Sequence, residues 1–571
     1  MKQINEIGRK ILTWMDHSVM QAPRWVDAWI LILITVLITA NPFYLNNRIN
    51  LYELSLYLPG INGILHGLVP FKDFFHLRGP LELYMPAWLM TMSGVHVGTL
   101  CAYFFIGNVL CLAVLVLIAK ELIRSRLIFY MMIPAIIART FPRVCFMNWG
   151  GMRYAFGLLA VFCLIRFFKS RKIGWMVAAG VISAAAVLTS VEIGICAGIA
   201  AVGALLIAGA SRLLSVADVR KGLIAFFAAG IIGITPWLVY SWQQQALLPY
   251  FEAMWTIITR FLTVINPHLA SVYPSNLPEA LAAMFNPGHD NFKQLTPAYT
   301  YLFLLGFLIW SWRKQQLTVS ILGIVAVSVY GFVLYEMAFR ALLASQFEMA
   351  LMPEKIVYFF LIEAVILWIW QKKTSWPSWQ SILISVLVMA LFVSSLAYTL
   401  TRFNKRFWAF QWAASVVSGK DKPALKFADK NEQYEELTLE RARGIWVPVD
   451  QALEIKQLDA FIRSHTSAGD EVLFFPELGG YNFIFDRPFV GRFPMSDLAW
   501  LHDQWFEEYL TDLKQLDAKY VIVQQRMPED WEKIYFGYAP NQYKFNQLSA
   551  VIRQSYRRVA QTEGSWIYER K

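Results

Sequence analysis

Long apolar blocks alternate with short polar or basic segments over the first 400 residues of the chain. About 20 predominantly apolar residues in a helix cross the hydrocarbon core of a bilayer. The pattern therefore predicts about eleven transmembrane helices, near residues 28–44, 98–119, 126–143, 153–168, 173–189, 193–210, 222–242, 299–312, 317–335, 356–371 and 380–400. The shorter stretch 80–95 contains two prolines, and we expect a helix at the membrane surface or a re-entrant segment there.

Basic residues mark one side of this membrane part. Every second loop carries Lys and Arg, at 120–126, 169–172, 212–221, 313–314 and 372–373. Cytoplasmic loops carry such an excess of basic residues, so we expect these loops and the N-terminus on the inside. The long loops 45–97, 243–298 and 336–355 then lie outside, together with everything after residue 400.

The pattern changes after residue 400. Helical spacing covers 449–465 and 497–516, whereas short apolar runs at 471–475, 520–525 and 565–568 are typical of strands. Strands that alternate with helices predict an α/β domain. We therefore expect three parts: a cytoplasmic amphipathic segment 1–27, a transmembrane body 28–400 and an extracytoplasmic α/β domain 401–571. The amphipathic segment shows no signal-peptide cleavage site, and the α/β domain is expected to cover the loop 45–97.

Composition supports the membrane assignment. Hydrophobic residues make up 57% of the 571 residues and charged residues only 16%, whereas soluble domains carry about a quarter charged residues. The net charge of +11 resides largely in the short loops, so no nucleic-acid partner is expected. The five cysteines lie in or beside apolar segments, which argues against a disulfide framework. Neither they nor the histidines show metal-ligand spacing, so we expect no obligatory metal.

The first long loop concentrates polar residues beside the membrane. Its segment 66–81 reads HGLVPFKDFFHLRGPL, and Glu53 precedes it. A carboxylate at a partly desolvated interface can have a raised pKa and serve as a general base, which makes Glu53 and Asp73 candidates. The guanidinium of Arg78 can hold a phosphate through two parallel hydrogen bonds. The same charges would also suit ordinary exposed ion pairs of a surface loop.

This segment resembles the GT-C class of membrane glycosyltransferases. It is most similar to the bacterial branch related to protein O-mannosyltransferases and lipid A aminoarabinose transferase. The resemblance extends to the N-inside topology, the large first outer loop and the C-terminal outer domain. Two tail stretches, TSAGDEVLFFP and FDRPFVGRF, are also similar to the tail domain of such proteins.

The resemblance implies an enzyme that moves a sugar from a polyprenyl-phosphate carrier to a lipid, polysaccharide or protein acceptor. The reaction would take place on the outer side of a bacterial inner membrane. An acidic residue of the first outer loop acts as base in the family. Glu53 is its best match, and Asp73 matches the second acidic position, so the base stays open between them. No cofactor is implied.

Further polar residues on the expected outer side are candidates for binding the substrates. Those nearest the loop motif are Lys72, His76, Arg78 and Arg153, and those in later loops are Arg260, Arg340 and Lys355. The later cations could equally be anchors that extend to the membrane surface.

Two other functions remain open. A transporter or flippase for a lipid-linked sugar or polysaccharide would have a similar hydropathy, although broken helices in matching halves are missing. A non-catalytic envelope assembly factor would tolerate loss of the first-loop carboxylates.

Overall fold

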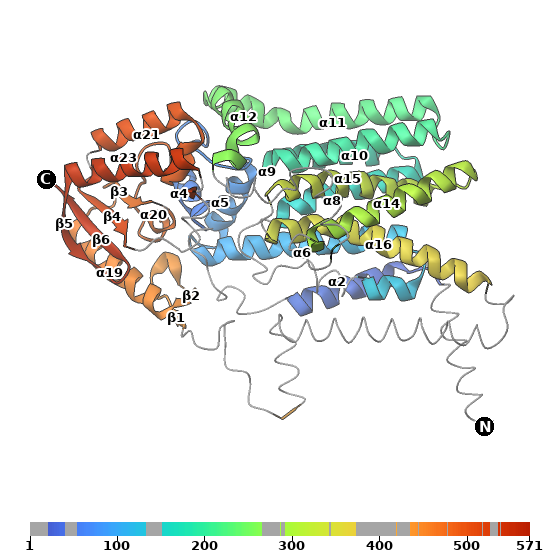
Figure 1. The fold of residues 1–571 in the computed structure, drawn as a ribbon, viewed down its shortest axis with the longest axis horizontal. Coiled ribbons are helices and arrows are strands. Elements are labelled where there is room, and N and C mark those ends of the chain that lie inside the picture. Colours follow the sequence, from blue (N-terminus) through green and yellow to red (C-terminus); the bar gives the residue numbers. More distant parts are fainter. Residues whose placement is uncertain are drawn as a thin grey trace.

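The computed structural model describes residues 21–39, 54–132, 151–264, 286, 292–341, 344–372, 418–419, 434–443, 445–476, 478–516, 518–525, 535–536 and 538–571. An elongated bundle of helices forms the larger part, and an α/β domain packs against one of its ends (Figure 1). We call the region where the two parts meet the junction.

In the described part of the chain, the helical residues 126–132 and nine longer helices form the bundle. The nine longer helices are α2 (Trp25–Thr39), α6 (Val97–Leu122), α8 (Gly151–Ser170), α9 (Gly174–Thr189), α10 (Val191–Ala210), α11 (Val216–Gln243), α14 (Phe292–Arg313), α15 (Val319–Ala341) and α16 (Ala344–Lys372). Five described stretches are long and apolar enough to cross a membrane: α6, α8, α10, α11 and the part Val319–Met337 of α15. The predicted helical membrane body is therefore confirmed.

The number of spans stays a prediction. The span expected at 380–400 and most of the amphipathic segment 1–27 lie outside the described residues, as do parts of the spans expected at 28–44 and 126–143.

Small residues let the bundle helices approach closely, as is common where helices pack in membranes. A Cβ atom on Gly180 of α9 would lie 2.2 Å from the carbonyl oxygen of Phe226 in α11. A Cβ on Gly157 of α8 would lie equally close, 2.2 Å, to the hydroxyl of Tyr330 in α15. Backbone proximity, and not only side-chain interdigitation, thus stabilises the bundle.

Three shorter helices lie near the junction: α4 (Leu58–Leu65), α5 (Leu81–Ser93) and α12 (Leu247–Val264). The helix expected over 80–95 is confirmed as α5, which contains Pro86 and packs on α4, α6 and α9. The connection expected outside over 243–298 contains the helix α12, and its side of the membrane stays a prediction. Three residues separate α12 from α11, and α14 already begins at Phe292.

The C-terminal domain combines two sheets with flanking helices. Its elements in order are β1 (Tyr434–Glu436), β2 (Trp446–Pro448), α19 (Val449–His465), β3 (Val472–Phe475), α20 (Gly480–Ile484), the 3-10 helix η5 (Ser496–Leu501), α21 (Asp503–Gln515), β4 (Tyr520–Gln524), α23 (Ala539–Ser555), β5 (Tyr556–Gln561) and β6 (Ser565–Arg570). The larger sheet has the order β3-β4-β6-β5, with β3 parallel to β4 and the other pairs antiparallel. The predicted α/β character and the predicted helix at 449–465 are confirmed.

One predicted element of this domain is wrong. The continuous helix expected at 497–516 is instead η5 followed by α21, because His502 between them has an extended backbone. Its ring nitrogen Nδ1 accepts a hydrogen bond from the backbone N–H of Gln504 at 3.2 Å. A side chain that accepts from the first turn caps a new helix, so the helical pattern restarts there.

Candidate active site at the junction

The segment 66–81, which we call the loop motif, contains a tight turn at 69–73 that Asp73 closes. The backbone N–H of Val69 donates to Asp73 Oδ2 at 2.7 Å, and the N–H of Asp73 donates to the Val69 carbonyl at 2.9 Å. Phe71 in this turn has a φ of +70°, a left-handed conformation that is uncommon outside glycine. The Phe71 ring is buried 5.0 Å from the ring of Tyr250 in α12, and this packing stabilises the turn.

Two further phenylalanines attach the loop to its surroundings. The Phe74 ring fits against Gly60 of α4, where a Cβ would lie 2.9 Å from the ring, and lies 6.0 Å from the ring of Phe489. The Phe75 ring lies 5.0 Å from the ring of Trp505 in α21. The backbone N–H of Phe75 donates to the Arg492 carbonyl at 2.8 Å. The loop motif is therefore held by the C-terminal domain as well as by the bundle.

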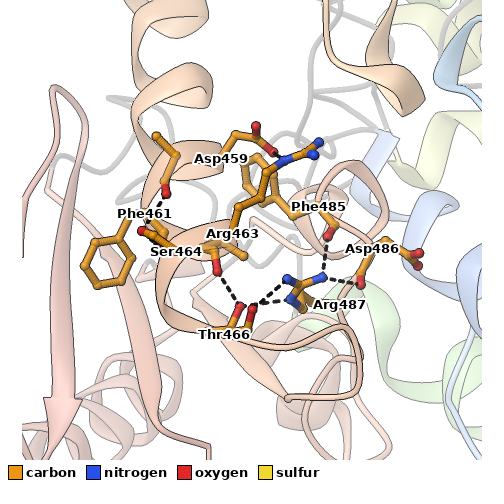
Figure 2. Close-up of polar contacts among 10 residues, drawn as sticks. Asp459, Phe461, Arg463, Ser464, Thr466, Phe485, Asp486 and Arg487 are labelled. Carbon is orange, nitrogen blue, oxygen red and sulfur yellow. Dashed lines mark hydrogen bonds and ion pairs between the residues drawn. The ribbon is translucent and has the colours of Figure 1, made fainter.

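The second tail stretch, residues 485–493, forms the other half of this contact. Arg487 is buried and donates to Thr466 and to the carbonyl oxygens of Phe485 and Asp486 (Figure 2). These bonds hold Asp486 in place, and its Oδ1 pairs with Arg441 at 2.8 Å and with Nε2 of His66 at 3.5 Å. The two sequence segments that resemble the same family thus fold against each other.

The end of the loop motif leads directly into α5. The N–H of Gly79 donates to the Thr189 carbonyl at 3.1 Å, and a Cβ on Gly79 would lie 2.2 Å from the Leu188 carbonyl oxygen. Only glycine permits this approach to the end of α9. Pro80 then starts the helix, where its missing N–H costs nothing. The Gly-Pro pair therefore determines where Arg78 and Glu82 lie.

Arg78, Glu82 and His76 form a buried polar group at this position. Glu82 is fully buried and His76 is 3% exposed, whereas Arg78 is half-buried. Burial raises the pKa of Glu82 to about 7, although Arg78 and Tyr57 act in the opposite direction. Burial and the charge of Arg78 lower the pKa of His76 to about 3. His76 is thus neutral near pH 7, and Glu82 exchanges its proton in that range.

Burial alone would lower the pKa of Arg78, but the surrounding groups hold it above its ordinary value. These groups are Tyr57, Glu82, Tyr154 and Glu192. The guanidinium therefore stays charged although it is half-buried. Nε2 of His76 beside it has no hydrogen-bond partner within the described part of the chain.

Arg153 extends this group from α8. It is 2% exposed, its guanidinium carbon lies 4.7 Å from the ring centre of Tyr154, and its Nη2 donates to the Tyr154 hydroxyl at 3.2 Å. Tyr154 also feels the charge of Arg78. We call His76, Arg78, Glu82, Arg153 and Tyr154 the junction cluster.

The structure brings only some of the predicted site residues together. His76, Arg78 and Arg153 belong to the junction cluster. Lys72 is exposed in the turn, and Asp73 is half-buried with one carboxylate oxygen bonded to Val69. Glu53 lies outside the described residues.

The cations predicted in later loops lie elsewhere. Arg260 is exposed on α12, where its charge acts on Asp503 of the C-terminal domain. Lys355 pairs with Glu354 at 2.7 Å on α16, and Glu354 also accepts from Thr300. The side chain of Arg340, on α15, lies outside the described part. Arg260 and Lys355, the two of these cations whose side chains are described, are therefore not part of the junction cluster as defined above.

Sequence reasoning missed Glu82 and the tyrosines Tyr57 and Tyr154. Glu82 follows the motif directly, in the first turn of α5, where an acidic residue is common for reasons of helix electrostatics alone. Its position one turn after Arg78 was the available signal. Among the described residues, no three His, Cys, Asp or Glu side chains are placed to hold a metal ion.

No protein-family model and no curated protein sequence matches the chain. Among solved structures, ArnT from Cupriavidus metallidurans bound to undecaprenyl phosphate is 10% identical, with a TM-score of 0.49 over 95% of this chain and 96% of that chain. The oligosaccharyltransferase AglB from Archaeoglobus fulgidus, in complex with an inhibitory peptide and a dolichol-phosphate, is 12% identical, with a TM-score of 0.45 over 96% of this chain and 74% of that chain. Both of these solved proteins are GT-C glycosyltransferases. At these identities no residue of this chain takes its role from theirs.

Proposed function

We propose that the protein is a membrane glycosyltransferase that moves a sugar from a polyprenyl-phosphate carrier to an acceptor on the outer face of the inner membrane. The observation that carries the proposal is the junction cluster. A guanidinium that remains charged lies half-buried where the helical body ends, on the loop motif that resembles GT-C enzymes. The polyprenyl tail would stay in the bilayer, so the donor phosphate has to be bound at the edge of the membrane, where the helical body ends.

Arg78 is the proposed partner of the donor phosphate. Its guanidinium can form two parallel hydrogen bonds to phosphate oxygens, and Glu82 and Glu192 help to keep it charged. Arg153 is too deeply buried to be reached first. Its positive charge instead adds to the potential that attracts a phosphate into the cluster.

The reaction would be a single displacement at the anomeric carbon. A carboxylate base accepts the proton of an acceptor hydroxyl, whose oxygen forms the new bond to the anomeric carbon. The bond from that carbon to the phosphate oxygen breaks, and its electron pair leaves with the polyprenyl phosphate. Arg78 stabilises the charge that develops on this leaving group, and the anomeric configuration is inverted.

Asp73 and Glu53 are both retained as candidates for the base. Oδ2 of Asp73 accepts the N–H of Val69, so its second oxygen is the one available for an acceptor proton. This bond also gives Asp73 a structural role in the turn. A substitution of Asp73 would therefore alter the conformation of the turn as well as remove a candidate base. The two effects have to be measured separately.

The acceptor would enter from the side of the C-terminal domain. This domain contacts the loop motif through Arg492, Asp486 and Phe489. It therefore covers the motif in this proposal and is placed to select the acceptor. In this proposal the domain is extracytoplasmic and the N-terminus is cytoplasmic. The acceptor class stays a lipid, a polysaccharide or a protein.

The test measures sugar transfer by the purified protein in vesicles with a panel of polyprenyl-phosphate sugars. The variants are Arg78→Gln, Glu53→Gln and Asp73→Asn, with Arg220→Gln as matched control because Arg220 is exposed at the start of α11. We expect loss of transfer with Arg78→Gln and with one of the carboxylate variants, and normal transfer with the control. Equal activity of all variants would overturn the proposal. So would movement of the lipid-linked sugar across the bilayer with no new glycosidic bond, which identifies a transporter.

A further inference from the structure

Helix α12 exposes a row of large apolar side chains. Leu248, Phe251, Trp255 and Ile258 are 80%, 54%, 70% and 55% exposed. Their spacing of three, four and three residues places them on one face of the helix. Exposed contiguous apolar surfaces of this kind mark contacts with a protein or a membrane.

The opposite face of α12 is covered by the junction. Tyr250, Ala253 and Met254 are buried there, and the Tyr250 ring packs on Phe71 of the loop motif. At the edge of the exposed face, Glu252 accepts a hydrogen bond from Nε1 of Trp505 at 3.0 Å. The helix is therefore amphipathic. Its polar edge contacts the C-terminal domain, and its apolar row is exposed.

The apolar row continues the exposed surface of α11. This candidate membrane span exposes Ile231, Ile232, Val239 and Trp242 at 64%, 70%, 45% and 71%. Trp242 lies at the end of α11, only a few residues before Leu248. Figure 1 shows α12 at the junction end of α11, turned across the direction of the bundle helices. Gln243, Gln244 and Gln245, of which the first and third are exposed, connect the exposed apolar surface of α11 to the apolar row of α12.

We infer that α12 lies in the membrane–water interface, with Leu248, Phe251, Trp255 and Ile258 inserted among the lipid acyl chains. Helices that have a strong apolar face and a polar rim bind in this orientation, and Trp is favoured at this depth. Glu252, Thr259 and Arg260, which are exposed on the remaining surface, then lie at the level of the lipid headgroups.

This placement has a consequence for the loop motif. Because Phe71 rests on the covered face of α12, the depth of α12 determines the depth of the 69–73 turn relative to the bilayer. The inference requires only that the bundle spans a membrane, and it holds whether or not the protein transfers a sugar.

The test uses nitroxide labels on the full chain in vesicles of phosphatidylethanolamine and phosphatidylglycerol. Single cysteines replace Leu248 and Trp255. Ile232→Cys on α11 serves as the lipid reference, and Val559→Cys, an exposed position of β5, serves as the aqueous reference. The parent protein reports the background from native cysteines, four of which are buried.

Collisions with molecular oxygen, which concentrates in lipid, are compared with collisions with a water-soluble nickel chelate. We expect labels at Leu248 and Trp255 to favour oxygen over the chelate, as the label at Ile232 does, and the label at Val559 to show the reverse ratio. Labels that behave like Val559 would place α12 in water and overturn the inference. Protection from both reagents would also overturn it, because a second copy of the chain or another protein would then cover the row.

Discussion

Two buried groups of charges, at the two ends of the helical bundle, are built in different ways. Far from the junction, Glu121 of α6 contacts Lys120, Arg166 and Lys169, with nitrogen–oxygen distances of 3.5, 2.9 and 2.7 Å. Each of its carboxylate oxygens thus faces a cation. We call this the far cluster.

The junction cluster differs in composition. It contains two arginines, a neutral histidine and a carboxylic acid with a pKa of about 7. The far cluster is a closed ion network that connects helices, as structural ion pairs do. A strongly perturbed pKa beside a cation at a domain junction is instead typical of functional sites. The comparison predicts that substitutions in the junction cluster impair activity, whereas substitutions in the far cluster impair stability.

The largest expected effect concerns Arg78→Gln. The variant loses the cation that stabilises the leaving phosphate, so transfer should slow by about 100- to 1,000-fold, the range for removing one such stabilising group. The unfolding midpoint in detergent should change far less than for substitutions of Glu121. The measurement is the turnover number with saturating donor. A variant that turns over normally would show that Arg78 has no role in the reaction.

The converse prediction concerns Glu121→Ala in the far cluster. Removing the buried carboxylate removes its charge-assisted hydrogen bonds from Arg166 and Lys169 and should cost about 3 to 4 kcal/mol of unfolding free energy. The turnover number per folded molecule should stay at the parent value, because the far cluster takes no part in transfer. Denaturant unfolding and transfer assays on the same preparation check both statements. Loss of turnover without loss of stability would remove the distinction between the clusters.

Sequence reasoning succeeded where structure is local. An apolar run long enough to cross a bilayer is visible in a single segment, and the runs 153–168 and 193–210 match α8 and α10. Helix α12 was not predicted because polar residues such as Glu252 keep its segment from being one long apolar run. The three- and four-residue spacing of its large apolar side chains was nevertheless a local sign of a helix.

The candidate site was found in part for the same reason. The loop motif and the tail stretch were recognised separately, but no local pattern shows that Phe75 and Arg492 form a hydrogen bond. Contacts between the two ends of the chain follow from the folded arrangement alone. The extent of Glu82 burial, and hence its raised pKa, likewise depends on neighbours from several helices.

A smaller effect should follow from Gly79→Ala, which tests how the junction cluster is positioned. The new Cβ would lie 2.2 Å from the Leu188 carbonyl oxygen, so the loop has to shift at a cost of about 3 kcal/mol. Because Arg78 moves with it, turnover should fall as well. Gly174→Ala is the matched control, since a Cβ there meets no atom within 4 Å. Equal unfolding free energies for the two variants would show that the approach at Gly79 is not restrictive.

The smallest expected effect is the pH dependence that Glu82 contributes. Its pKa rises from 4.5 to about 7 on folding, chiefly through burial. The folded state therefore holds a proton that the unfolded state releases, so this stability is complete below pH 4.5 and is lost as the pH rises through 7. Between pH 5 and pH 7 the parent should lose on the order of 2 kcal/mol through this group.

Between pH 5 and pH 7, the unfolding free energy of Glu82→Gln should therefore fall by on the order of 2 kcal/mol less than that of the parent. The measurement is the unfolding free energy in detergent at both pH values. Asp497→Asn is the control, because Asp497 is another buried carboxyl whose pKa is raised to about 7, and it lies in the C-terminal domain. It should remove its own contribution and leave that of Glu82 in place. If Glu82→Gln keeps the pH dependence of the parent, Glu82 is already ionised in the folded protein. The junction cluster would then be a closed ion network like the far cluster, and the distinction between the two ends would rest on Arg78 alone.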